Sequence, residues 1–298
     1  MGRPGLRRCA AAHVAGGPAL AAGACAAHPG AAGQSVNDRA EPVRLAKRVA
    51  ELKGCSRSEA ERYIEGGWVT VNGTVIEVPA FKVAAQQTVA VDANATLIAQ
   101  GPVTLLLNKP SGYEAGLAAP GEGQGPQGCR SRGAPPALQL LTPQNRAAND
   151  ASGTRLLQKH FTALKGLMAL PTEASGLVVF TQDWRIERKL TEDAELIEHE
   201  VMADVDGAVD AAQLQRLCHG LSFNGRALPP ARVSISSTDA KRTRLRFALK
   251  GIRPGQIPAM CDAVGLRLRA LARLRIGRVA LGGLAPGQWR YLQDHERF

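Results

Sequence analysis

Apolar residues recur every three or four positions in two short neighbouring stretches, residues 45–52 and 57–65. This spacing places them on one face of a helix, so the pattern predicts two short amphipathic helices. Ser56 precedes the second stretch and Glu59 follows three positions later, which is the pattern of a capping box. Gly54 is expected to end the first helix.

Runs rich in β-formers predict strands further along the chain. Residues 68–76 contain two such runs around an Asn72-Gly73 pair, a strong local signal for a tight hairpin. Residues 103–107 and 175–183 are nearly continuous apolar runs, typical of buried strands. The first unit is therefore expected to consist of two helices followed by a hairpin, and a larger sheet-containing unit is expected to follow it.

Two segments lack this periodicity. Residues 1–40 carry arginines and then an Ala/Gly-rich stretch, and residues 116–153 are rich in Gly, Pro and Gln. Such compositions bury too little apolar surface to offset chain entropy, so a disordered tail and a long flexible insertion are expected. A targeting leader is the alternative for the first segment, although its Gly-Pro breaks interrupt both an apolar run and an amphipathic helix.

The charge of the chain favours a polyanionic partner. Its 298 residues include 37 Lys and Arg against 26 Asp and Glu, a formal charge of +11, and nucleic acid binds such surfaces through counterion release. A merely soluble basic protein is the alternative. The 6 cysteines form no C-x-x-C pair, so we expect no metal site. No apolar run is long enough to cross a membrane.

The first unit resembles the S4 RNA-binding domain. The resemblance rests on several short motifs at fixed spacing, namely Arg44-Leu45-Ala46-Lys47, Gly54-Cys55-Ser56-Arg57-Ser58-Glu59-Ala60, Tyr63-Ile64, Gly67-Trp68-Val69 and Val71-Asn72-Gly73. It implies an RNA-binding module over residues 41–99.

The candidate RNA-binding residues of this module lie at its helix ends and hairpin. They are Arg44, Lys47, Arg48, Ser56, Arg57 and Asn72. Cationic and hydroxyl donors at a helix N-terminus suit phosphate groups. The alternative is that these charges only solvate two amphipathic helices.

The remainder, residues 100–298, resembles the catalytic domain of bacterial rRNA pseudouridine synthases of the RsuA and RluF type, in which an S4 domain also comes first. The motifs that carry this resemblance are Asn108-Lys109-Pro110-Ser111-Gly112, Ser175-Gly176-Leu177-Val178-Val179, Gly255-Gln256-Ile257, Arg275-Ile276-Gly277 and Gly287-Gln288-Trp289-Arg290. It implies an α+β fold whose second domain has a mixed, mostly antiparallel sheet flanked by helices.

Three positions depart from the family pattern. Where the resemblance implies the catalytic aspartate, the base-stacking tyrosine and the arginine that partners the aspartate, this chain has Pro171, Val201 and Pro258. Proline has no nucleophile and no titratable group, and valine offers no ring for stacking. The chain is thus expected to have no catalytic residue, with Glu173, two positions after Pro171, as a weak substitute.

Two further places carry candidate RNA contacts. Lys109 is expected either to contact RNA or to pack its stem beside Pro110. Near the C-terminus, arginines alternate with leucines, and we expect the arginines to face outward as a basic ridge that holds RNA or is only solvated. They are Arg267, Arg269, Arg273, Arg275 and Arg278.

Together these features predict a catalytically degenerate, RNA-binding relative of the pseudouridine synthases. The expected partner is structured RNA, foremost ribosomal RNA, and the expected protein is a cytoplasmic monomer without cofactor or membrane attachment. An active isomerase with a rearranged site and a protein-interaction scaffold are the alternatives.

Overall fold

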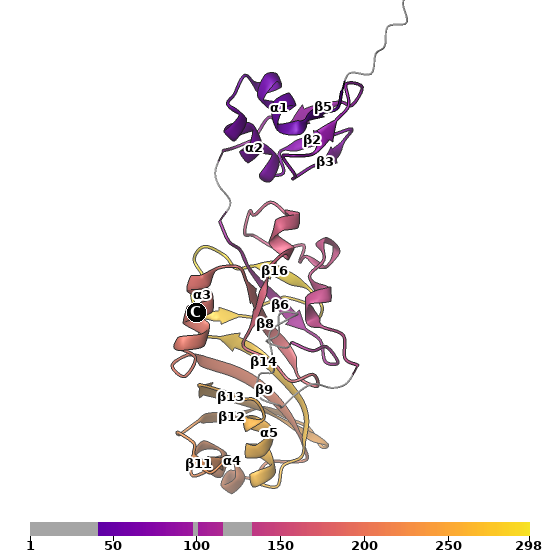
Figure 1. Ribbon diagram of the computed structural model, residues 1–298. Coiled ribbons are helices and arrows are strands. Elements are labelled where there is room, and N and C mark those ends of the chain that lie inside the picture. Colours follow the sequence, from indigo (N-terminus) through magenta and orange to yellow (C-terminus); the bar gives the residue numbers. More distant parts are fainter. Residues whose placement is uncertain (1–40, 98–100, 116–132) are drawn as a thin grey trace, which may run out of the picture. The chain divides into compact units, whose positions relative to one another are not determined.

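The computed structural model describes residues 41–97, 101–115 and 133–298 (Figure 1). The expected tail, residues 1–40, and the first part of the expected insertion, residues 116–132, lie outside the described residues.

The first unit has the predicted helices and hairpin. Its helices are α1 (Leu45–Lys53) and α2 (Arg57–Glu65), and its strands are β1 (Val43–Arg44), β2 (Val69–Val71), β3 (Thr74–Val75), β4 (Lys82–Val83) and β5 (Val89–Val91). Strands β3, β2 and β5 form an antiparallel sheet in that order, and β1 pairs with β4.

Local chemistry explains where these elements begin and end. The Ser56 side chain accepts a hydrogen bond from the Glu59 backbone N–H, and the Glu59 carboxylate accepts one from the Ser56 N–H. This confirms the capping box, which satisfies N–H groups that a helix start leaves free. Gly54 ends α1 with φ 64°, and Asn72 (φ 51°) and Gly73 (φ 80°) make the hairpin turn, as predicted.

The second unit, as far as it is described, is built on a nine-stranded sheet. Its strands are β6 (Thr104–Lys109), β7 (Lys165–Leu167), β8 (Ser175–Thr181), β9 (Glu198–Asp206), β12 (Arg232–Thr238), β13 (Arg242–Lys250), β14 (Leu268–Ile276), β15 (Val279–Ala280) and β16 (Trp289–Tyr291). The main path runs β12-β13-β9-β14-β8-β6-β16. Only β14 and β8 pair in parallel among these described strands, so the sheet is mixed and mostly antiparallel.

Helices cover parts of this sheet. They are α3 (Trp184–Glu192), α4 (Ala211–Cys218) and α5 (Gln256–Ala263), with short 3-10 turns η1 (Ala137–Leu140), η2 (Pro143–Asn145) and η3 (Gln158–Phe161) and a small hairpin, β10 (Ser222–Phe223) and β11 (Arg226–Ala227). Figure 1 shows α4 and α5 beside β12, β13 and β9, and their buried side chains share one hydrophobic cluster. No helix within the described ranges is long and apolar enough to cross a membrane.

The central strand β8 is buried on both faces. Leu177 and Val179 pack in a cluster with Leu190 of α3, whereas Val178 and Phe180 pack on the opposite side. This burial explains the continuous apolar run in the sequence, because a strand covered on both faces needs no polar alternation.

Part of the segment expected to be a flexible insertion is in fact packed. Residues 133–153 carry η1 and η2, and Ala137, Leu141 and Ala147 are buried. The Trp289 indole N–H donates to the Thr142 carbonyl at 2.6 Å. The expectation of flexibility was therefore wrong for these residues. A few apolar side chains are enough to order a Gly/Pro-rich segment when they can pack against the face of a sheet.

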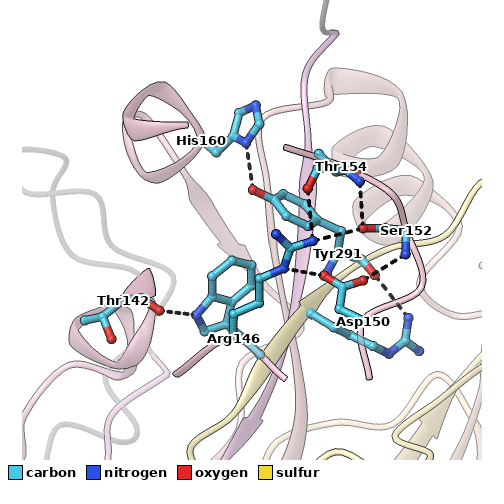
Figure 2. A network of polar contacts seen from close by, with 9 residues as sticks. Thr142, Arg146, Asp150, Ser152, Thr154, His160 and Tyr291 are labelled. Carbon is cyan, nitrogen blue, oxygen red and sulfur yellow. Dashed lines mark hydrogen bonds and ion pairs between the residues drawn. The ribbon is translucent and has the colours of Figure 1, made fainter. Parts of the chain in front are cut away.

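A polar network around Tyr291 fixes the same segment (Figure 2). The His160 Nδ1 and Tyr291 hydroxyl lie 2.7 Å apart, and the Arg146 guanidinium lies 4.9 Å from the centre of the Tyr291 ring. Arg146 also donates to Asp150 at 2.8 Å. Burial lowers the pKa of His160 to about 4 and raises that of Tyr291 to about 12, so both rings are neutral at physiological pH.

Gly176 allows β8 to approach β14 closely. Its φ is +110°, and a Cβ at this position would lie closer than 3.0 Å to the backbone N, C and O of Arg273. Only glycine combines this backbone conformation with the absence of a side chain. The parallel pairing of Arg273 with Gly176 depends on it.

Gly176→Ala is therefore expected to destabilise the protein severely, by about 3 kcal/mol or more, because a positive φ and a backbone clash combine. Gly225→Ala is the matched control, since Gly225 also has a positive φ (+74°) but a Cβ there would meet nothing within 4 Å; its cost should be about 1 kcal/mol. Chemical denaturation of both variants measures the difference. Equal destabilisation would contradict the close approach.

Candidate functional site

Three residues far apart in the sequence line one pocket in the second unit. Pro171 lies in the loop between β7 and β8, Val201 on β9 and Pro258 in the first turn of α5. These are the positions at which the resemblance implied an aspartate, a tyrosine and an arginine. The structure thus brings together the three positions that the sequence singled out.

The pocket has a volume of about 330 Å³ and mostly apolar walls. Polar side chains in its lining come from Thr191, Arg253 and Arg273, and no described carboxylate belongs to the lining. Glu173, the weak substitute, is exposed and is not part of this lining. Its charge acts instead on Lys109, whose pKa it raises against the effect of burial.

Arg273 is the buried cation of the pocket. It is 3% exposed, and it donates from Nε to the Leu177 carbonyl at 2.8 Å and from Nη2 to the Met168 carbonyl at 2.5 Å. Burial lowers the pKa of Arg273 to about 9, so the guanidinium stays charged at neutral pH. Because Met168 begins the loop that carries Pro171, Arg273 positions this loop on the sheet.

Lys109 holds the other end of the loop. Its Nζ is buried and donates to the carbonyls of Pro110, Tyr113 and Thr172 at 3.1, 2.8 and 3.2 Å. Of the two expectations for this residue, the packed one is confirmed. Burial lowers the pKa of Lys109 to about 8; Glu173 opposes this shift and Arg273 adds to it.

A bulge in β14 separates Arg273 from Arg275. Arg273 lies opposite Val201 on β9, whereas Arg275 lies opposite Glu200, with a register shift between them. Residues two apart in a strand normally share a face, but the extra residue in a bulge reverses this. Arg273 therefore faces the pocket, and the expectation that it faces outward was wrong.

Arg275 lies on the opposite face but is not free. It donates to Glu198 at 2.6 Å and to Glu200 at 3.1 Å. Similar pairs join Arg244 to Asp204 and Arg269 to Asp206. Of the expected ridge, Arg269 and Arg275 thus meet carboxylates of β9, whereas Arg267 and Arg278 are exposed and form no ion pair with a described residue.

The candidate residues of the first unit fall into two groups. Arg44, Lys47 and Arg48 are exposed at the start of α1 and form no ion pair with a described residue. They provide a small region of available positive charge.

The others already have structural partners. The Ser56 hydroxyl is engaged with Glu59 in the capping box, so the α2 N-terminus is occupied by a carboxylate. Arg57 pairs with Glu61 at 3.4 Å, an exposed contact that is weak and easily exchanged. Asn72 accepts a hydrogen bond from the Thr88 N–H at 2.9 Å. Ser56 and Asn72 therefore stabilise the module itself.

Comparison with known proteins agrees with this architecture. The S4 domain family matches residues 43–89. Ribosomal small subunit pseudouridine synthase A of Salmonella typhimurium is 27% identical over 257 residues, covering 85% of this chain and 98% of the relative. Ribosomal large subunit pseudouridine synthase B of Bacillus subtilis is 25% identical and covers 85% of this chain and 93% of the relative. The chain is homologous to bacterial ribosomal pseudouridine synthases.

This homology extends beyond the S4 domain, because 257 aligned residues far exceed the span 43–89. The predicted order of an S4 domain and a synthase-like domain with a mixed sheet is therefore confirmed. A crystal structure of a pseudouridylate synthase resembles the chain with a TM-score of 0.48 and 20% identity, covering 84% of this chain and 96% of that one.

Sequence reasoning missed several pocket residues. Arg253 precedes α5, Thr191 and Ala194 come from α3 and the turn after it, and Arg273 comes from β14. A leucine-arginine alternation gave no sign of the bulge that turns Arg273 inward. The only signal for Arg253 was its place three residues before the Gln256-Ile257 motif.

Lys109 should make stability depend on pH in a defined window. The pKa of its ammonium group is lowered in the folded state, to about 8 from 10.5, so between these values the unfolded chain binds more protons and stability rises with pH. Lys109→Met should remove this contribution. In denaturant titrations, the unfolding free energy of the wild type should rise relative to that of the variant between pH 8 and pH 10.5.

Lys165→Met is the control, because Lys165 is exposed and pairs with Glu187 at the surface. Its difference from the wild type should stay nearly constant over the same range. A flat difference for Lys109→Met as well would show that the ammonium is not held in a buried site.

Proposed function

We propose that this protein binds structured RNA, in the first place ribosomal RNA, and that its synthase-like domain does not isomerise uridine. The observation that carries the proposal is the lining of the pocket. Pro171, Val201 and Pro258 converge there, and no described carboxylate accompanies them.

Chemical reasoning supports the loss of catalysis. A reaction of the kind implied by the resemblance needs a carboxylate placed at the base, and catalytic groups lose about a hundredfold in rate when displaced by about 1 Å. Proline at 171 supplies neither a nucleophile nor a proton acceptor. Glu173 is exposed and outside the pocket lining, so reaching the pocket would require a different loop path. That path is opposed by the hydrogen bonds from Arg273 and Lys109 at the two ends of the loop.

The RNA-binding part of the proposal rests on the S4 domain and on its free cations. Arg44, Lys47 and Arg48 are exposed near the start of α1. Cations without internal partners bind phosphate without first breaking an ion pair, whereas paired arginines such as Arg275 must give up their carboxylates. The relatives are named for the small and large ribosomal subunits, which makes ribosomal RNA the first RNA to test.

Arg48→Ala should weaken binding to small-subunit ribosomal RNA transcribed in vitro. It should also reduce the slope of log affinity against log salt concentration by about one, since one phosphate contact is lost. Lys189→Ala is the matched control, because Lys189 is an exposed cation of α3 that pairs with Asp193 at 2.8 Å. Filter binding over a salt series measures both quantities. Equal effects of the two variants would argue against the S4 surface.

Incubation of the purified protein with the same unmodified RNA should produce no pseudouridine. Carbodiimide labelling followed by reverse transcription maps the product at single-nucleotide resolution, and a small-subunit synthase such as the Salmonella relative serves as the positive control. A site that appears with the wild-type protein and disappears with Glu173→Ala would replace this proposal by an isomerase with a rearranged site. Recovery of no RNA above background after crosslinking in cells would favour a protein-interaction scaffold.

A further inference from the structure

The pocket combines positive charge with the absence of a counter-ion. Arg253 and Arg273 line it. Burial lowers the pKa of the nearby Lys109, Glu173 opposes that shift, and the charge of Arg273 adds to it. Arg253 has only a loose pair with Glu195, at 3.7 Å, and that carboxylate is largely exposed. No described carboxylate balances these cations inside the pocket.

Arg273 has capacity left for a ligand. Its Nε and Nη2 atoms each donate to a backbone carbonyl. Its Nη1 atom has no acceptor among the described residues, and this atom is not fully buried. A guanidinium has five N–H donors, so this buried, pocket-lining side chain keeps donors without an acceptor among the described residues.

The start of α5 adds to the same positive region. Gly255 is its N-cap and has no side chain to cap the first turn, and Gly255, Ile257 and Pro258 all line the pocket. A helix N-terminus favours an anion through its free N–H groups. Here the Gln256 N–H already donates to the Arg253 carbonyl at 3.1 Å and Pro258 has no N–H, so the Ile257 N–H is the group of the first turn that is left for a ligand. The buried Arg273 is therefore the main feature that points to an anionic ligand, and the Ile257 N–H adds one donor to it.

The remaining walls determine what else the ligand must contain. They are formed mainly by apolar side chains, including Leu167, Leu170, Leu190, Ile257 and Leu271. A volume of about 330 Å³ is within the range of small-molecule sites. Such walls bury an apolar body but leave extra oxygen atoms without partners.

We propose that this pocket binds a small organic carboxylate with an apolar body. The two oxygens of a carboxylate match the geometry of a guanidinium, and the apolar body fills the rest of the pocket. A neutral nucleobase would leave the cation unpaired. A phosphodiester presents two anionic oxygens as a carboxylate does, but its ester oxygens and attached sugars would lie against mainly apolar walls. The inference shares with the proposed function only the absence of a carboxylate from the pocket.

Phenylacetate and hexanoate are suitable probes, each compared with its primary amide, which has nearly the same shape and no charge. Titration calorimetry and protein NMR shifts with the full chain should show saturable binding of the carboxylates and binding at least about tenfold weaker for the amides, a difference of about 1.4 kcal/mol. The perturbed NMR signals should come from residues that line the pocket.

Pro171→Asp should reduce carboxylate binding at least about tenfold, because it places an internal carboxylate beside Arg273 that competes with the ligand. Pro171→Asn is the matched control, with nearly the same shape and no charge, and should retain affinity within about threefold. Arg253→Gln gives a second test away from the loop: it should weaken carboxylate binding and leave the weaker amide binding unchanged. Thermal unfolding checks that each variant is folded.

Equal affinity for carboxylates and amides, or unchanged phenylacetate binding by folded Pro171→Asp, would overturn the inference. So would the absence of saturable binding of either acid. None of these results would affect the proposed function, which fails instead if the protein produces pseudouridine or does not bind RNA.

Discussion

Two hydrogen bonds from the buried guanidinium of Arg273 connect the parts on which the pocket depends. One joins β14 to β8 at Leu177, and the other joins β14 to the loop that begins at Met168. The close approach at Gly176 makes the first bond geometrically feasible, and the second sets the path toward Pro171. If Arg273 moved, the sheet contact, the loop and the pocket floor would move with it.

Holding a buried cation with carbonyls rather than with a carboxylate has an energetic consequence. A buried charge is costly unless hydrogen bonds compensate its lost hydration, and removing one member of a buried ion pair usually costs about 3–5 kcal/mol. Arg273 has two carbonyl acceptors and Lys109 has three. The fold around the pocket therefore does not require an aspartate at position 171, so its stability is independent of the chemistry that an aspartate would perform.

The parts of the fold that could be predicted are those determined by neighbouring residues. Ser56 and Glu59 specify a helix cap, and Asn72 and Gly73 specify a turn. In each case the two residues lie within four positions of each other, and both features are present. The inward position of Arg273 depends on a bulge whose partner strand is about 70 residues away in sequence. Likewise, composition could not show that Ala137 and Leu141 find a sheet face to cover. The three pocket positions could be predicted only because motifs on either side preserved their spacing.

The net charge of +11 conceals two different kinds of basic region. In the synthase-like domain, Arg244 and Arg275 stand opposite carboxylates of β9, so much of their field is cancelled within the sheet. In the S4 domain, Lys47 and Arg48 are exposed and have no ion pair with a described residue. Exposed cations of this second kind bind phosphate and release counterions without first giving up an ion pair inside the protein. Positive charge that is available to a polyanion is therefore present in both domains, at Lys47 and Arg48 of the S4 domain and at exposed, unpaired cations such as Arg267 and Arg278 of the synthase-like domain.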